Sequence, residues 1–215
     1  MNNIKRISLS LVFVLLLSFS IPSVAATTGE SNALRSAGTY LTFSAFSYQG
    51  LIDQLEFEGY TTAEATYAAD NCGADWNEQA AKSAANYLNF MAFSLDGLID
   101  QLEFEGFTEE QAAYGANHAY SDSGSQALKS AENYLSFSAF SYKGLIKQLE
   151  FEGFSTEDAT SAADNCGADW NEQAVKSAAN YLSFMAFSKS GLINQLEFEG
   201  FTHEQAVYGA EQNGY

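Results

Sequence analysis

The sequence predicts an all-α protein built from four tandem three-helix repeats. The phrase Phe-Ser-x-x-Gly-Leu-Ile-x-Gln-Leu-Glu-Phe-Glu-Gly begins at Phe46 and recurs at Phe93, Phe140 and Phe187, a spacing of 47 residues each time. No stretch alternates apolar and polar residues over the length of a strand, and turn residues separate segments of helical spacing. A period of about 20 to 50 residues is typical of repeat architectures, in which neighbouring units bury one another's faces.

The sequence also has a second, longer period of 94 residues, which is twice the first. Residues 71–80 reappear without change as residues 165–174. The pattern is interrupted once, at the polar segment 120–125. We therefore expect two similar halves with helix-turn-helix-like units: residues 27–121 hold repeats 1 and 2, and residues 122–215 hold repeats 3 and 4.

The first helix of a repeat is the longest. In the second repeat it is expected from about Asp75 to Phe93, with Asp75 as N-cap and Glu78 completing a capping box. Apolar residues at helical spacing form a wide stripe on it, with alanines that allow a close approach of another helix. The stripe consists of Trp76, Ala80, Ala84, Tyr87, Leu88 and Met91.

Two shorter helices follow in each repeat. The second is expected to begin after Ser47, which is a good N-cap, and to stop at Gly59, which suits a left-handed C-cap. The third begins at Thr61, with Glu64 completing a Thr-x-x-Glu box, and ends near Gly73. Its counterparts are expected to begin at Thr108, Ser155 and Thr202.

The N-terminal segment, residues 1–26, predicts a secretory signal peptide. Lys5 and Arg6 precede an apolar run, and small residues at Ala25 and Ala26 offer a cleavage site. The run is shorter than the 18 or so residues of a spanning helix. No cysteine for lipid attachment lies in this segment, so we expect membrane contact only if it stays uncleaved.

The net charge excludes nucleic acid as a partner, and the composition excludes a disordered acidic tail. Without residues 1–26 the chain has 27 acidic and 7 basic side chains, a net charge of −20. Phosphate backbones bind basic proteins, so nucleic acid is excluded as a partner although the helix-turn-helix outline is present. Hydrophobic residues make up 47% of the chain, which is too many for a disordered acidic tail.

The repeat resembles a known family. The segments that carry the resemblance are Ala80 to Leu88, Phe93 to Phe107 and Gln111 to Tyr114, together with the linker Cys72 to Ala80. They are similar to the Ltp-like host cell surface-exposed lipoprotein family, and the resemblance covers all four repeats. It implies tandem helix-turn-helix repeats outside the membrane of a Gram-positive bacterium. It also implies superinfection exclusion, in which an acidic face engages the phage tape-measure protein and blocks delivery of phage DNA.

The candidate partner-binding residues are a repeated Glu-Phe-Glu triplet. Adjacent helical residues are about 100° apart, so the two glutamates of one triplet cannot converge as an acid/base pair. We expect a basic protein as the partner, bound with strong dependence on salt. The residues are Glu56, Phe57, Glu58, Glu103, Phe104, Glu105, Glu150, Phe151, Glu152, Glu197, Phe198 and Glu199.

The phenylalanines of these triplets admit two interpretations. In one, Phe57 and its three counterparts pack beneath the adjacent repeat. In the other, each is an exposed aromatic rimmed by acids and serves as a binding anchor.

The remaining polar residues predict no catalytic, metal or cofactor site. Cys72 and Cys166 occupy identical positions and could form a disulfide in an exported protein, or remain buried free thiols. His118 and His203 lie in different repeat contexts, which rules out a repeated histidine-based metal site or thiol base. We therefore expect a non-enzymatic binding protein. A secreted cell-envelope or host-interaction protein that binds a basic partner, unrelated to phage, is the alternative.

Overall fold

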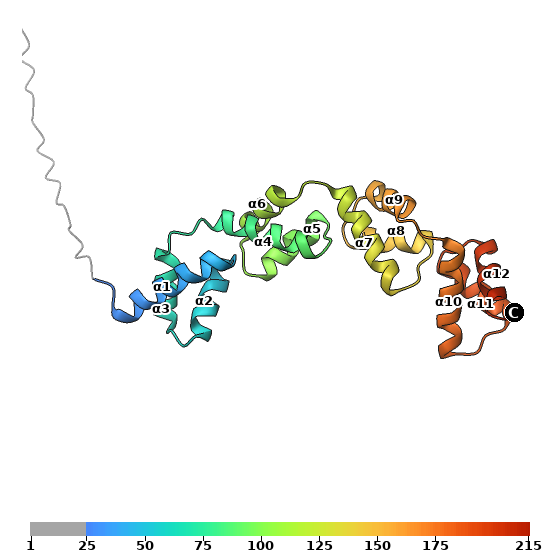
Figure 1. Cartoon of the computed structure of the whole chain (residues 1–215), viewed down its shortest axis with the longest axis horizontal. Coiled ribbons are helices and arrows are strands. Elements are labelled where there is room, and N and C mark those ends of the chain that lie inside the picture. The colour runs from blue at the N-terminus through green and yellow to red at the C-terminus, as the bar shows by residue number, and fades with distance from the viewer. Residues whose placement is uncertain (1–24) are drawn as a thin grey trace, which may run out of the picture.

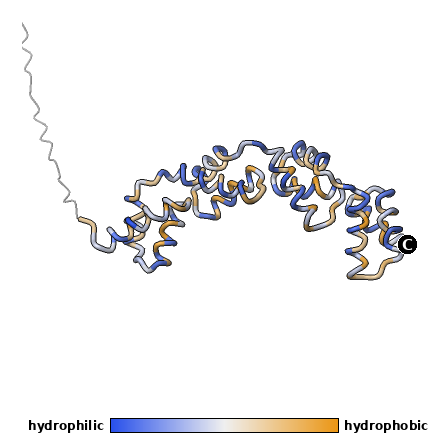
Figure 2. Tube along the Cα trace, viewed as in Figure 1, coloured by the Kyte–Doolittle hydropathy of each residue, from blue (hydrophilic) through white to orange (hydrophobic). Residues whose placement is uncertain are grey.

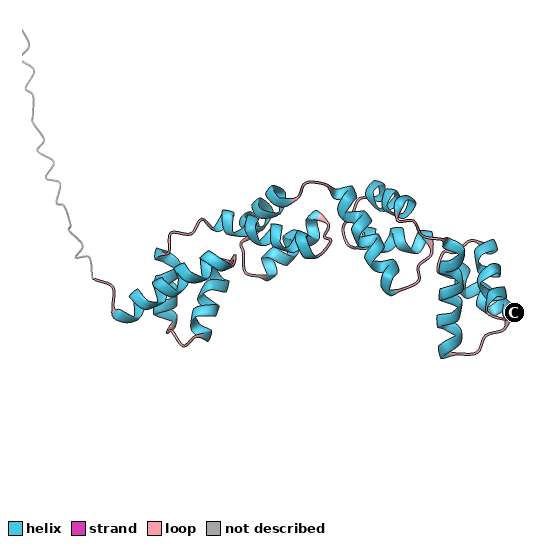
Figure 3. Cartoon of the chain, in the orientation of Figure 1, coloured by secondary structure: helices cyan, strands magenta, loops and turns pink. Residues whose placement is uncertain are grey.

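The computed structural model describes residues 25–215, and this part of the chain contains twelve helices and no strand (Figure 3). The prediction of an all-α fold with four three-helix units is confirmed. The helices are α1 (Thr28–Phe43), α2 (Tyr48–Phe57), α3 (Thr62–Asn71), α4 (Trp76–Phe90), α5 (Leu95–Phe104), α6 (Glu109–Ala119), α7 (Ser123–Phe137), α8 (Tyr142–Phe151), α9 (Thr156–Asn165), α10 (Trp170–Phe184), α11 (Lys189–Phe198) and α12 (His203–Gln212).

The four units follow one another along an arc, with α1–α3 at one end and α10–α12 at the other (Figure 1). We call them units 1 to 4. Within each unit the third helix packs against both the first and the second. Hydrophobic stretches recur inside every unit (Figure 2), and each unit has its own cluster of buried residues.

The buried cores are made of small and branched side chains. In unit 2 the fully buried residues include Ala80 and Ala84 of α4 together with Leu98 and Leu102 of α5. At Gly115 a Cβ atom would lie 2.5 Å from the backbone carbon of Ala80, so only glycine permits this approach of α6 to α4. The first helix of the unit is thus held close by small residues, as the alanine stripe predicts.

The predicted helix caps are present. Ser47 accepts a hydrogen bond from the amide of Gly50 at 2.9 Å, and Thr61 and Glu64 form the expected capping box. Gly59 has a φ of +96°, the left-handed conformation expected of a C-cap glycine. The counterparts of Thr61 also cap their helices; these are Thr108, Ser155 and Thr202.

Two details of the first helix are wrong in the prediction. Asp75 accepts hydrogen bonds from the amides of Asn77 and Glu78, at 2.9 and 3.3 Å, but the reciprocal bond of a capping box is not formed among the described residues. The helix also ends at Phe90 rather than Phe93. Met91 is its C-cap with extended backbone, so the chain turns away before Phe93 is reached.

The units are joined by hydrogen bonds more than by shared faces. The buried Ser47 donates to the backbone carbonyl of Glu105 in the next unit at 2.5 Å. Ser94 and Ser141 donate in the same way to the carbonyls of Glu152 and Glu199. Since substantial helix packing occurs only within units, the expectation that neighbouring units bury one another's faces is wrong in the main.

The joint between units 1 and 2 repeats between units 3 and 4. In both, a tryptophan packs edge-to-face on a tyrosine of the preceding unit, as Trp76 does on Tyr48 at 5.5 Å. In both, a buried glutamine side chain accepts from a backbone amide of the preceding unit, as Gln79 does from Phe46 at 3.4 Å. These contacts belong to the segment that repeats every 94 residues.

The middle joint, between units 2 and 3, is different. Gln126 stands at the position of the bridging glutamine, but its buried side-chain oxygen has no hydrogen-bond partner among the described residues. Lys129 instead donates to the carbonyl of Leu88 in unit 2 at 3.2 Å. The domain boundary between residues 121 and 122 falls here and stays a prediction.

The signal-peptide prediction falls on residues 1–24, outside the described residues, except for its last positions Ala25 and Ala26. Among residues 25–215, none of the helices has the length and apolar character needed to cross a bilayer.

Candidate protein-binding surface

The phenylalanine of each Glu-Phe-Glu triplet lies at the C-terminal end of the second helix of its unit. All four rings are 87% exposed, so the interpretation that they pack beneath the adjacent unit is wrong. They are the exposed aromatics of the other interpretation. The residues are Phe57, Phe104, Phe151 and Phe198.

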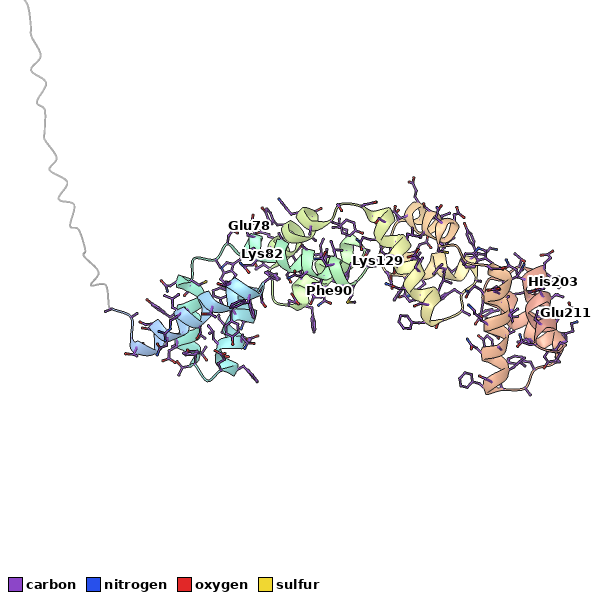
Figure 4. All side chains as sticks on the ribbon, viewed as in Figure 1. Glu78, Lys82, Phe90, Lys129, His203 and Glu211 are labelled. Carbon is purple, nitrogen blue, oxygen red and sulfur yellow. The ribbon has the colours of Figure 1, made fainter. Side chains whose placement is uncertain are left out.

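A second set of phenylalanines is equally exposed and was not predicted from the sequence. Each ends the first helix of its unit, and they are Phe43, Phe90, Phe137 and Phe184, exposed by 82%, 85%, 89% and 87%. Figure 4 shows Phe90 projecting from the concave edge of the arc, with Glu78 on the opposite edge. The residue three positions later is a phenylalanine that packs on a core tyrosine, as Phe93 does on Tyr87. A recurring pair of aromatics three residues apart was the available signal.

The second glutamate of each triplet has a structural role within its unit. The carboxylate of Glu105 accepts a hydrogen bond from Ser83 at 2.8 Å and another from the Tyr87 hydroxyl. Gln101 donates to the same hydroxyl at 3.2 Å. The network repeats around Glu152 in unit 3 and Glu199 in unit 4.

Unit 1 holds a reduced form of this network. Glu58 accepts a hydrogen bond from the Tyr40 hydroxyl. Ser36, the counterpart of Ser83, does not bond the glutamate and is instead hydrogen-bonded to the Tyr60 hydroxyl at 3.0 Å. The other units have a buried phenylalanine, such as Phe107, where unit 1 has Tyr60. The second glutamates are therefore poor candidates for direct partner contact, because binding would have to break these internal hydrogen bonds.

These networks raise the pKa of their tyrosines above the ordinary value of about 10. For Tyr87 and Tyr134, burial is the main cause, followed by the hydrogen bond to the glutamate. For Tyr40 and Tyr181, the hydrogen bond to the glutamate raises the pKa most. In each case the neutral phenol is favoured, because it donates to the carboxylate and avoids a second negative charge beside it.

The first glutamates of the triplets are exposed and differ in their local partners. The carboxylates of Glu56 and Glu103 accept no hydrogen bond and form no ion pair with any residue of the described part. Glu150 accepts from the Thr156 hydroxyl at 2.5 Å, and Glu197 contacts the ring nitrogen Nδ1 of His203 at 2.7 Å. The exposed rings thus stand beside carboxylates that solvent or a partner can reach.

Grooves lie at two of the joints. The larger, which we call the middle groove, lies between units 2 and 3 and has a volume of about 520 Å³. Its apolar walls are Phe90, Met91 and Phe93 on one side and Tyr134, Phe137 and Phe151 on the other. A smaller groove of about 330 Å³ lies between units 1 and 2 and shares Phe90 and Met91.

The cysteines do not join the units. Cys72 and Cys166 are both free thiols in the described structure, so the disulfide considered from the sequence is not formed there. Each thiol donates to the carbonyl of the residue three positions earlier, at 3.3 Å, at the end of its helix. Residues 25–215 contain no group of three or more histidine, cysteine or acidic side chains that could hold a metal ion.

Comparison with known families shows that one family matches all four units. The family described as host cell surface-exposed lipoprotein, Ltp, matches four segments, residues 29–72, 75–118, 122–166 and 169–212. The chain belongs to this family. The matched segments coincide with units 1 to 4, so each three-helix unit is one copy of the Ltp repeat.

One solved structure is similar in sequence. It is that of Ltp, a superinfection exclusion protein from the Streptococcus thermophilus temperate phage TP-J34. The two sequences are 32% identical over 43% of this chain and 96% of that chain, with a TM-score of 0.41. No curated protein matches this chain.

Proposed function

We propose that this Ltp-family protein acts outside the membrane in superinfection exclusion, by binding a basic protein of the incoming phage and blocking delivery of its DNA. The observation that carries the proposal is the surface formed by the four exposed pairs of glutamate and phenylalanine. We call it the acidic-aromatic surface; its pairs are Glu56/Phe57, Glu103/Phe104, Glu150/Phe151 and Glu197/Phe198.

Exposed apolar patches rimmed by polar residues mark interaction sites. Large aromatic anchors are typical of the residues that dominate binding energy. Here each anchor adjoins a carboxylate, and the chain without residues 1–26 carries a net charge of −20. A cationic partner is therefore attracted over a distance and then held by apolar contact.

The repetition of the surface favours a long partner. A protein with several basic segments can engage several units at once, which raises the overall affinity without any new type of contact. The phage tape-measure protein, which the family resemblance implies, is our candidate partner. Membership of the surface-exposed lipoprotein family and the exclusion activity of the similar Streptococcus thermophilus phage protein support this assignment.

The test is phage challenge of a susceptible Gram-positive host that exports the wild-type protein or a variant. The test variant carries Glu→Gln and Phe→Ser at all four pairs of the acidic-aromatic surface. A charge-matched control carries Glu→Gln at four exposed glutamates elsewhere, one of which, Glu78, lies on the edge opposite Phe90 (Figure 4). The control positions are Glu78, Glu110, Glu132 and Glu172.

We expect the wild type and the control to reduce plaque formation and the test variant to restore it. Equal exclusion by the test variant and the wild type would show that the acidic-aromatic surface is not the site. If the wild type excludes no phage of a broad panel but still binds basic proteins in a salt-dependent way, the alternative of an envelope or host-interaction protein replaces this proposal.

A further inference from the structure

The middle groove differs from the rest of the surface because two units contribute rings to it. Phe90 belongs to α4 of unit 2, whereas Phe137 and Phe151 end helices α7 and α8 of unit 3. Phe137 is 89% exposed and Phe151 is 87% exposed, so the walls of the groove are apolar and open to solvent. The volume of about 520 Å³ lies within the range of roughly 300 to 1,000 Å³ usual for binding pockets.

The acidic side chains at the groove restrict what can occupy it. Asp100 lines the groove and is exposed, and its carboxylate forms no hydrogen bond or ion pair with another described residue. Unit 2, residues 75–121, has eight acidic side chains and one lysine. A second copy of the chain would bring a further net charge of about −20 to the same place, and an anionic lipid surface would be repelled in the same way.

The shape of the groove favours a helical occupant. A peptide that binds by adding a strand needs an open sheet edge, and the described residues contain no strand. A groove between the helices of two units, walled by aromatic side chains, suits the apolar face of an amphipathic helix whose anchors are spaced three and four residues apart.

We propose that the middle groove binds a cationic amphipathic helix of a partner protein. Its apolar residues lie between the rings of Phe90 and Phe137 and against Phe151, and its lysines or arginines face Asp100. This rests on the proposed function, since Phe151 belongs to the acidic-aromatic surface and the helix is the part of the basic partner that is recognised.

The probe is a synthetic peptide of leucine and lysine, about 18 residues long, patterned to place all leucines on one helical face. Its binding to residues 27–215 is measured by fluorescence anisotropy. A scrambled peptide of the same composition controls for charge. Phe137→Ser is compared with Phe43→Ser, which changes the matching residue of unit 1; Phe43 lines neither of the two grooves.

We expect the patterned peptide to bind more tightly than the scrambled one. Phe137→Ser should weaken binding about tenfold, and Phe43→Ser by less than about twofold. Asp100→Asn should weaken binding and reduce its dependence on salt. Because both phenylalanines are exposed, circular dichroism should show unchanged helix content in either variant.

Three results would overturn the proposal: equal binding of the two peptides, equal loss in the two phenylalanine variants, or a groove already occupied by lipid or a second copy. The last would appear as co-flotation with phosphatidylcholine vesicles, or as a dimer in sedimentation, lost on Phe137→Ser.

Phage challenge separates this proposal from the proposed function. A Phe137→Ser variant that no longer binds the peptide but excludes phage as well as the wild type would overturn the groove as the recognition site and leave exclusion standing. A wild type that binds the peptide in the groove but excludes no phage would support the groove and refute exclusion.

Discussion

The hydrogen bonds between units can be tested by one pair of serine substitutions. Ser141 caps α8 through the amide of Gly144 at 2.9 Å and also donates to the carbonyl of Glu199 in unit 4 at 2.6 Å. Ser188 is its counterpart in unit 4, caps α11 through Gly191 at 3.1 Å, and makes no bond to another unit among the described residues. The two serines therefore share the cap and differ in the joint.

Loss of an N-cap costs about 1 kcal/mol, and loss of a neutral hydrogen bond costs about another 1 kcal/mol. We expect Ser141→Ala to lower the free energy of unfolding by about 2 kcal/mol and Ser188→Ala by about 1 kcal/mol. Urea unfolding followed by circular dichroism, fitted with separate unit and neighbour terms, measures both. Equal losses of unfolding free energy in the two variants would refute the claim that these serines join the units, because loss of the helix cap alone would then explain the effect of Ser141→Ala.

Three further predictions concern the stability of the units. Glu105→Gln should lower the free energy of unfolding by about 1 to 2 kcal/mol, because Ser83 and Tyr87 lose a charged acceptor, whereas Glu103→Gln, two residues earlier, should change it by less than about 0.5 kcal/mol in the same urea titration. The folded state raises the pKa of Tyr87, so the contribution of this tyrosine to the free energy of unfolding is fully present below about pH 10 and is lost as the pH rises through the raised value. The urea midpoint should therefore fall above about pH 10. A urea midpoint that does not change up to high pH would contradict this. Gly115→Ala should destabilise the protein by about 1 to 3 kcal/mol in thermal unfolding, since its Cβ would meet the backbone of Ala80; a neutral effect would show that α6 can move away from α4.

Local signals in the sequence predicted the architecture well. The cap residues Ser47 and Thr61 act on amides three residues away, and Gly59 can adopt the left-handed conformation that the end of its helix requires. Such features are settled within one turn of the chain, so the order and number of the helices follow from the repeat. The first helix ends three residues before the predicted position, because no capping side chain in the sequence marks the extended backbone at Met91.

The candidate surface could be predicted only in part. Both glutamates of a triplet flank the same buried face in the sequence pattern, yet Glu105 is held by Tyr87, 18 residues earlier, and Glu103 is not. The exposure of Phe90 depends on where its helix ends and on how little the units cover one another, and neither is visible in a local pattern. The middle groove likewise exists only because Phe137 and Phe151 of unit 3 face unit 2.

We propose that this protein stops phage DNA after the phage has bound the cell. The most direct measurement scores adsorption and DNA delivery separately, on a susceptible host that exports the wild-type chain. We expect normal adsorption with delivery blocked, and delivery restored when the four pairs of the acidic-aromatic surface are changed. Unimpaired delivery across a panel of phages, with the protein confirmed outside the membrane, would contradict it.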